Sequence, residues 1–201
     1  AFRGAIDSGA HMIELDVNLS KDRQLVVIHD ATLERTTNGH GSVHDHTLVE
    51  LKQLDAGSWF HPDFADERLP ELGEVLDLVD GRVITNIEIK SNAYEPHHPV
   101  DAIEKQVVDL VKQKKALDAV LISSFKAEIL MQVSEMADRP PLALISSDPA
   151  DGETIKLCQD INAFSWHPDH RILTGSQVEK MHAAGLKVFP YTVDTMAEYL
   201  K

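Results

Sequence analysis

The segment that decides the fold reads Met12-Ile-Glu14-Leu-Asp16-Val-Asn-Leu-Ser-Lys21-Asp-Arg-Gln-Leu25-Val-Val-Ile-His29-Asp30. It contains two apolar runs that are joined by a short polar connection. A parallel crossover needs a dozen or more residues, so the two runs are predicted to pair as an antiparallel hairpin. With Asp22-Arg23 as a two-residue loop, the register sets Asp16 opposite His29.

The same segment contains several candidate functional side chains. Glu14 and Asp16 project from one face of the predicted strand because strand side chains alternate. A carboxylate pair and an imidazole then meet, which suits a hard divalent cation and a proton-transfer group. A purely structural role is the alternative, since a lone carboxylate on a strand is usually solvated. Two like charges on one face of an apolar strand are costly, however, unless they are paired or bind a metal.

Composition limits the classes of protein and partner. The 201 residues, 43% of them hydrophobic, suit a single domain over residues 1–201. The net charge of -14 would repel nucleic acid and anionic membrane, so neither is an expected partner. No apolar run is as long as a membrane-spanning helix. The single cysteine, Cys158, fits a reducing compartment and hence a cytoplasmic location. The oligomeric state does not follow from the sequence.

Short apolar runs alternate with helical patterns along the chain. Strands are predicted at 12–17, 83–89, 119–124, 142–145, 163–166 and 187–193, and helices at 72–79, 101–114, 126–137, 151–159 and 175–184. Continuous apolar strands between amphipathic helices are typical of a parallel sheet that is buried on both faces.

The number of these units favours a closed barrel. Six parallel strands lie between an opening helix at 1–10 and a closing helix at 195–200. One further strand before and one after would give eight, which closes a (β/α)8 TIM barrel whose first and last strands are missing from this sequence. An open doubly wound sheet is the alternative, but no glycine-rich phosphate loop supports it. Residues 31–71 interrupt the alternation of strands and helices and are predicted to form a small insertion over the barrel mouth.

The strand ends carry the candidate site, because catalytic groups of such barrels lie at the C-terminal ends of strands. Glu88 and Lys90 share a face at the end of the second predicted strand, as Glu14 and Asp16 do on the first. Carboxylates without a cysteine or histidine pair favour Mg²⁺ or Ca²⁺ over zinc. A cation beside a lysine suggests an anionic substrate group, for which a phosphate ester is the simplest candidate.

Several motifs follow one another in a characteristic order: Glu14-x-Asp16, His29-Asp30, Leu33-x-Arg-Thr-Thr-Asn-Gly39, Asp55-Ala-Gly-Ser-Trp59, Leu69-Pro70, Asn86-Ile-Glu-Ile-Lys90, Ser123-Ser-Phe125 and Gly185-Leu-Lys-Val. In this order they resemble a known family, the glycerophosphodiester phosphodiesterases of the small bacterial cytoplasmic type. The resemblance extends through most of the chain.

The resemblance implies a (β/α)8 barrel, a divalent metal, and a place in glycerol and lipid metabolism. The implied reaction hydrolyses a small glycerophosphodiester to glycerol 3-phosphate and an alcohol. By position, Glu14, Asp16 and Glu88 would bind the metal, His29 would be one of two acid–base histidines, and Lys90 would contact the phosphate.

The sequence also departs from the family pattern. The His-Arg-Gly and Glu-Asn-Thr motifs are not in this sequence, so the second histidine and a phosphate-binding arginine are expected to lie outside it. The family commonly has Asp-Gly where this chain has Asp22-Arg23. A type I′ turn needs positive φ at both central residues, which arginine resists, so another turn type is expected.

Two points of mechanism and substrate stay open. Family resemblance implies attack by the substrate's own 2-hydroxyl through a cyclic phosphate, but the sequence alone equally allows direct attack by water. Phe125, Trp166 and Tyr191 are candidate contacts for the glycerol or alcohol part, with burial in the core as the alternative. A phospholipase on a related barrel that acts on a lipid phosphodiester, and an inactive fragment or binding module, are the alternative functions.

Overall fold

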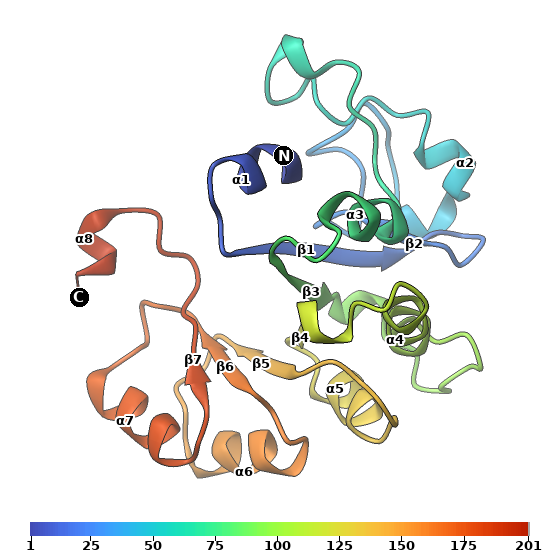
Figure 1. Cartoon of the computed structure of the whole chain (residues 1–201). Coiled ribbons are helices and arrows are strands. Elements are labelled where there is room, and N and C mark those ends of the chain that lie inside the picture. Colours follow the sequence, from blue (N-terminus) through green and yellow to red (C-terminus); the bar gives the residue numbers. More distant parts are fainter. Residues whose placement is uncertain (201) are drawn as a thin grey trace. The chain divides into compact units, whose positions relative to one another are not determined.

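The computed structural model describes residues 1–200, which form two compact units (Figure 1). The first unit is Ala1–Val120 and the second comprises the described residues from Leu121 onward. The helices and strands of the first unit are α1 (Phe2–Asp7), β1 (Met12–Leu19), β2 (Leu25–Val27), α2 (Leu48–Leu51), α3 (Leu72–Val79), β3 (Ile84–Ile89) and α4 (Ile103–Gln113). Next come β4 (Val120–Ser124), α5 (Ala127–Ser134), β5 (Leu142–Ser146), α6 (Gly152–Asp160), β6 (Ser165–Pro168), α7 (Gly175–Ala183), β7 (Lys187–Val188) and α8 (Met196–Tyr199).

The first unit is built around β1. This strand pairs antiparallel with β2 on one side and parallel with β3 on the other. Its odd-numbered residues, from Ile13 to Leu19, are buried, whereas Glu14 and Asp16 on the opposite face keep contact with solvent. The alternation that the sequence predicted therefore separates an apolar face from a polar face that carries the carboxylates.

The hairpin between β1 and β2 has a different register from the predicted one. Leu19 pairs with Leu25, and Asp16 lies opposite Ile28, whose backbone N–H donates to the Asp16 carbonyl over 3.0 Å. The prediction that placed Asp16 opposite His29 was wrong by one residue. The cause is a three-residue loop in which Arg23 takes a φ of 60°, the left-handed residue that such loops require. The expectation of another turn type is confirmed.

The segment 31–71 has an apolar cluster of its own. Val26 and Ile28 from the hairpin form it with Leu33, Val43, Leu51 and Leu69. Apart from α2, the described residues of this segment form short 3-10 turns and irregular loops. Gly57 marks a close backbone approach here, because a Cβ atom at this position would lie 1.9 Å from the Phe64 carbonyl oxygen.

The second unit repeats a strand–helix alternation. Its strands lie in the order β4-β5-β6-β7 and pair in parallel. Helix α5 packs against β5, and α7 packs against β7. Strand β7 is shorter than the predicted 187–193. Tyr191 just beyond it still forms a parallel bridge with Asp169.

The predicted order of elements agrees with the structure. Six strands that the sequence predicted as parallel are present as β1, β3 and β4–β7, and α3 has the predicted bounds. Among the described helices, none has both the length and the apolar character that a bilayer crossing requires.

Candidate active site

Three carboxylates converge on the polar face of the first unit. Glu14 and Asp16 come from β1, and the register of the parallel pair places Glu88 of β3 beside Asp16. Each of the three offers an oxygen atom, and these atoms lie within 4.8 Å of one another. Neighbouring parallel strands thus bring together residues that are more than seventy positions apart in the sequence.

Lys90 follows directly after β3 and joins this group. Its Nζ atom donates to Glu88 Oε1 over 2.8 Å and to Asp16 Oδ1 over 3.1 Å. The three side chains are largely buried, with exposed fractions between 12% and 16%. With all three carboxylates ionised, as they would be around a cation, the cluster and the Lys90 ammonium together carry a net charge of -2.

The pKa values of the cluster reflect its burial and its excess of carboxylates. Desolvation raises the pKa of Glu14 to about 8, and the carboxylates of Asp16 and Glu88 add to the rise, although the residue keeps surface open to solvent. Burial also raises the pKa of Glu88, against which the Lys90 ammonium and the charge of His29 act. Desolvation opposes the charge of Lys90, but its contacts with Glu88 and Asp16 prevail and raise its pKa.

This arrangement fits a hard divalent cation. Its donors are carboxylate oxygens only, which suit Mg²⁺ or Ca²⁺. When Glu14 is ionised as well, the net charge of -2 equals the charge that such a cation would neutralise. Glu14 is accessible to solvent, so a cation can reach the cluster. The role of these residues as metal ligands stays a prediction.

His29 belongs to a second polar chain beside the carboxylates. Its Nδ1 atom lies 2.6 Å from Asp30 Oδ1, and Arg35 donates to both oxygens of Asp30 over 2.6 and 2.8 Å. The hydrogen bond from Arg35, ahead of that with His29, holds the pKa of Asp30 well below its usual range. Asp30 is therefore ionised and can only accept, so it keeps a proton on Nδ1 and leaves Nε2 to exchange one.

The sequence argument assigned no role to Asp30 or Arg35. Both were visible in the motifs His29-Asp30 and Leu33-x-Arg35, but their contact depends on how the loop after β2 returns. The charge of Asp16 also raises the pKa of Arg35, after the hydrogen bond with Asp30, so the two polar chains interact electrostatically.

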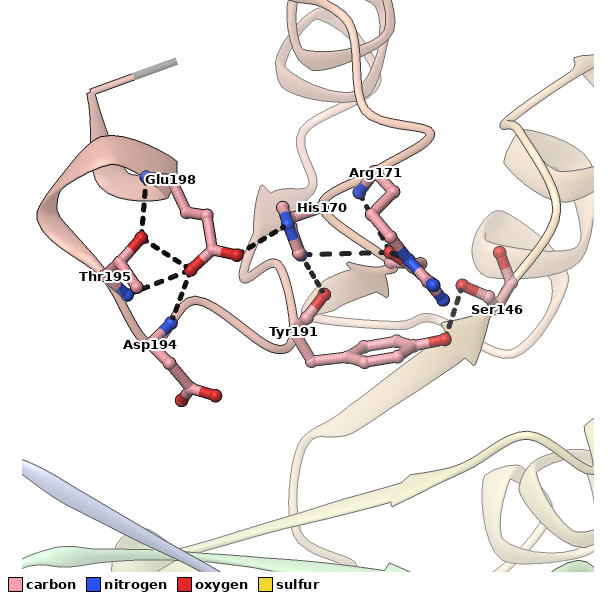
Figure 2. A network of polar contacts seen from close by, with 8 residues as sticks. Ser146, His170, Arg171, Tyr191, Asp194, Thr195 and Glu198 are labelled. Atoms are coloured by element: carbon pink, nitrogen blue, oxygen red, sulfur yellow. Dashed lines mark hydrogen bonds and ion pairs between the residues drawn. The ribbon is translucent and has the colours of Figure 1, made fainter.

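The three predicted aromatic contacts belong to the second unit. Phe125 is 42% exposed, and its ring meets Tyr191 edge to face with centroids 5.8 Å apart. Figure 2 shows the polar network that fixes Tyr191: its hydroxyl donates to the Ser146 carbonyl over 3.2 Å, and its own carbonyl lies 3.4 Å from Nδ1 of the His170 ring. The Tyr191 carbonyl also accepts from the His170 backbone N–H over 2.7 Å. The His170 ring also lies 3.6 Å from Glu198.

Trp166 differs from the other two aromatics. Its side chain is fully buried, and its Nε1 atom donates to Ser146 Oγ over 3.2 Å. The indole therefore supports the residue that also holds Tyr191.

Comparison with known proteins points to one family. The model of the glycerophosphoryl diester phosphodiesterase family matches residues 1–201. A glycerophosphodiester phosphodiesterase of Caldanaerobacter subterraneus subsp. tengcongensis is 42% identical over 195 residues, with 96% of this chain and 78% of the relative covered. A glycerophosphodiester phosphodiesterase of Bacillus altitudinis is 37% identical over 97% of this chain and 79% of its own length.

Solved structures give the same result for the fold. A phosphodiesterase of Oleispira antarctica, in complex with the product sn-glycerol-3-phosphate, superposes with a TM-score of 0.89 at 28% identity. The match covers 99% of this chain and 79% of the other. The predicted (β/α)8 fold class is confirmed.

Proposed function

The chain belongs to the glycerophosphoryl diester phosphodiesterase family, and from this premise we propose that it hydrolyses small glycerophosphodiesters with the help of a divalent cation. The products would be glycerol 3-phosphate and an alcohol. The observation that carries the proposal is the convergence of Glu14, Asp16 and Glu88 with Lys90, together with an oriented His29 that interacts electrostatically with Glu88. The product in the Oleispira antarctica structure supports the choice of substrate.

Glu14, Asp16 and Glu88 would hold the cation. When bound, Mg²⁺ or Ca²⁺ neutralises phosphoryl oxygens and so makes phosphorus easier to attack. Lys90 adds a second positive charge at the same place. Because Asp16 and Glu88 fix its ammonium group from two sides, Lys90 can donate to a phosphate oxygen with little loss of side-chain freedom.

His29 would move the proton. Hydrolysis breaks one P–O bond, joins one oxygen of the nucleophile to phosphorus, and delivers one proton to the leaving alcohol. The neutral imidazole with its proton held on Nδ1 by Asp30 presents Nε2 as the base. The same atom can afterwards return the proton. Asp30 and Arg35 act through His29 and are positioning residues.

Phe125 and Tyr191 stay the predicted contacts for the glycerol or alcohol part of the substrate. Phe125 is exposed, and Tyr191 is held in place through Ser146 and His170. Trp166 would contribute as a support for Ser146. We also propose a cytoplasmic location, because the one cysteine, Cys158, is a buried free thiol.

A specific observation favours a second substrate class. Trp59, Phe60 and Phe64 in the insertion are exposed by 43–71%, and their rings contact one another at 5.8–5.9 Å. Exposed aromatic residues are common where proteins meet lipid, so a lipid phosphodiester is the alternative substrate. Turnover of soluble glycerophosphocholine and of micellar lysophosphatidylcholine separates the two. We expect turnover of the soluble diester, and turnover of the micellar lipid alone would replace the proposal.

The cation site has its own test. Isothermal titration of the chelator-treated protein with Mg²⁺ and with Ca²⁺ should show binding that Glu14→Gln weakens by roughly tenfold or more. Glu153→Gln, on an exposed turn of α6, is the matched control and should bind like the parent. Equal affinities of the parent and Glu14→Gln would remove Glu14 from the site.

A further inference from the structure

Asn86 has an amide oxygen that the fold leaves without a partner. The residue lies in β3 and is only 5% exposed, and its Oδ1 atom is buried with no hydrogen-bond partner among the described residues. A buried acceptor without a partner costs about 1–3 kcal/mol. Native structures contain few such atoms, and a bound ion or water molecule is one of the usual reasons for them.

The position of Asn86 suggests what that oxygen faces. In the parallel register Asn86 lies beside Glu14, and it precedes Glu88 by two residues. Because strand side chains alternate, Asn86, Glu88 and Lys90 share one face of β3, whereas Thr85 and Ile87 occupy the other. The amide thus stands on the polar face of β3, beside the strand that contributes Glu14 and Asp16.

We propose that Asn86 supplies a further oxygen to the cation held by Glu14, Asp16 and Glu88, either directly or through one bound water; this rests on the proposed function. Hard cations take six or more oxygen ligands, and side-chain amide oxygens are among those they accept. The three carboxylates alone leave that shell incomplete. A neutral oxygen fills it without adding to the negative charge of the three carboxylates.

The variant Asn86→Leu tests this role, because leucine is similar in size and removes only the polar atoms. Titration of the chelator-treated protein with Mg²⁺ and with Ca²⁺ should show a Kd raised by roughly tenfold or more, the range found when groups that support a metal site are removed. The thermal midpoint of the same protein in chelator should stay the same or rise, because a buried acceptor without a partner has been removed.

Thr85→Val is the matched control. It makes the same kind of polar-to-apolar change one residue away, on the opposite face of β3, and should leave the Kd of the cation unchanged. An Asn86→Leu protein that binds the cation as tightly as the parent, while the parent binding still depends on Glu14, would overturn the role of Asn86 alone. A parent protein that binds neither cation would overturn the cation site, and this role with it.

Discussion

Lys90→Met removes the one ammonium group that balances the carboxylate cluster, and it keeps most of the aliphatic stem. In the parent, that ammonium contacts Glu88 over 2.8 Å and Asp16 over 3.1 Å. The substitution removes one positive charge from the cluster and leaves both contacts unmade. We expect the variant to be less stable without metal and to bind a divalent cation more tightly than the parent.

The expected magnitude follows from burial. Removing one partner of a buried ion pair costs about 3–5 kcal/mol. The three side chains keep 12–16% of their surface exposed, so the lower end, about 3 kcal/mol, is appropriate. For a chain of this size each kcal/mol shifts the midpoint of thermal unfolding by about 2–4 °C, so the loss should be roughly 6–12 °C.

The assay is thermal unfolding followed by circular dichroism, first in chelator and then in saturating Mg²⁺. The difference between variant and parent should shrink when the cation is present, because it binds the more negative cluster more strongly. Lys105→Met is the control, since Lys105 forms an exposed pair with Asp109 that contributes little. A Lys90→Met protein that unfolds within about 2 °C of the parent in chelator would refute the pairing.

Three further predictions concern other parts of the chain. Burial lowers the pKa of His167 from 6.5 to about 4, so between these pH values the unfolded chain binds a proton at this residue and the folded unit does not. The free energy of unfolding, measured in urea, should therefore fall by about 3 kcal/mol in all as the pH is lowered from 6.5 to about 4. His167→Gln should lose that dependence, and equal slopes in parent and variant would contradict it. Asp30→Asn removes the anionic acceptor of His29, so steady-state kinetics should show kcat reduced by roughly 10²-fold with KM nearly constant, and an unchanged kcat would exclude Asp30 from positioning. Gly57→Ala places a methyl group against the Phe64 carbonyl and should lower the free energy of unfolding by about 1–3 kcal/mol in denaturant. A variant as stable as the parent would show that the loop can shift to accommodate the methyl group.

The elements that the sequence predicted best are those with a strong period. Helix α3 has the predicted bounds because its apolar residues repeat at helical spacing between a capping box and a left-handed Asp80. The convergence of Glu14 and Asp16 followed from alternation along β1, and Glu88 with Lys90 followed from the same rule on β3. Local pattern therefore determined both the fold class and most of the carboxylate cluster.

Other features depend on geometry that no local pattern encodes. The hairpin register depends on whether Arg23 takes a positive φ, which is unfavourable for arginine in isolation. Here its guanidinium hydrogen-bonds Glu95 over 2.7 Å and also contacts Asp101, partners more than seventy residues away. The contact between Asp30 and Arg35 likewise exists only once the loop after β2 has folded back.

The most direct test of the account measures glycerol 3-phosphate released from glycerophosphocholine, with added Mg²⁺ or Ca²⁺ and with chelator, for the parent and for Glu14→Ala. The account predicts turnover that needs the cation and that Glu14→Ala abolishes. Turnover that continues in chelator and in Glu14→Ala would contradict a reaction centred on the cluster of Glu14, Asp16 and Glu88.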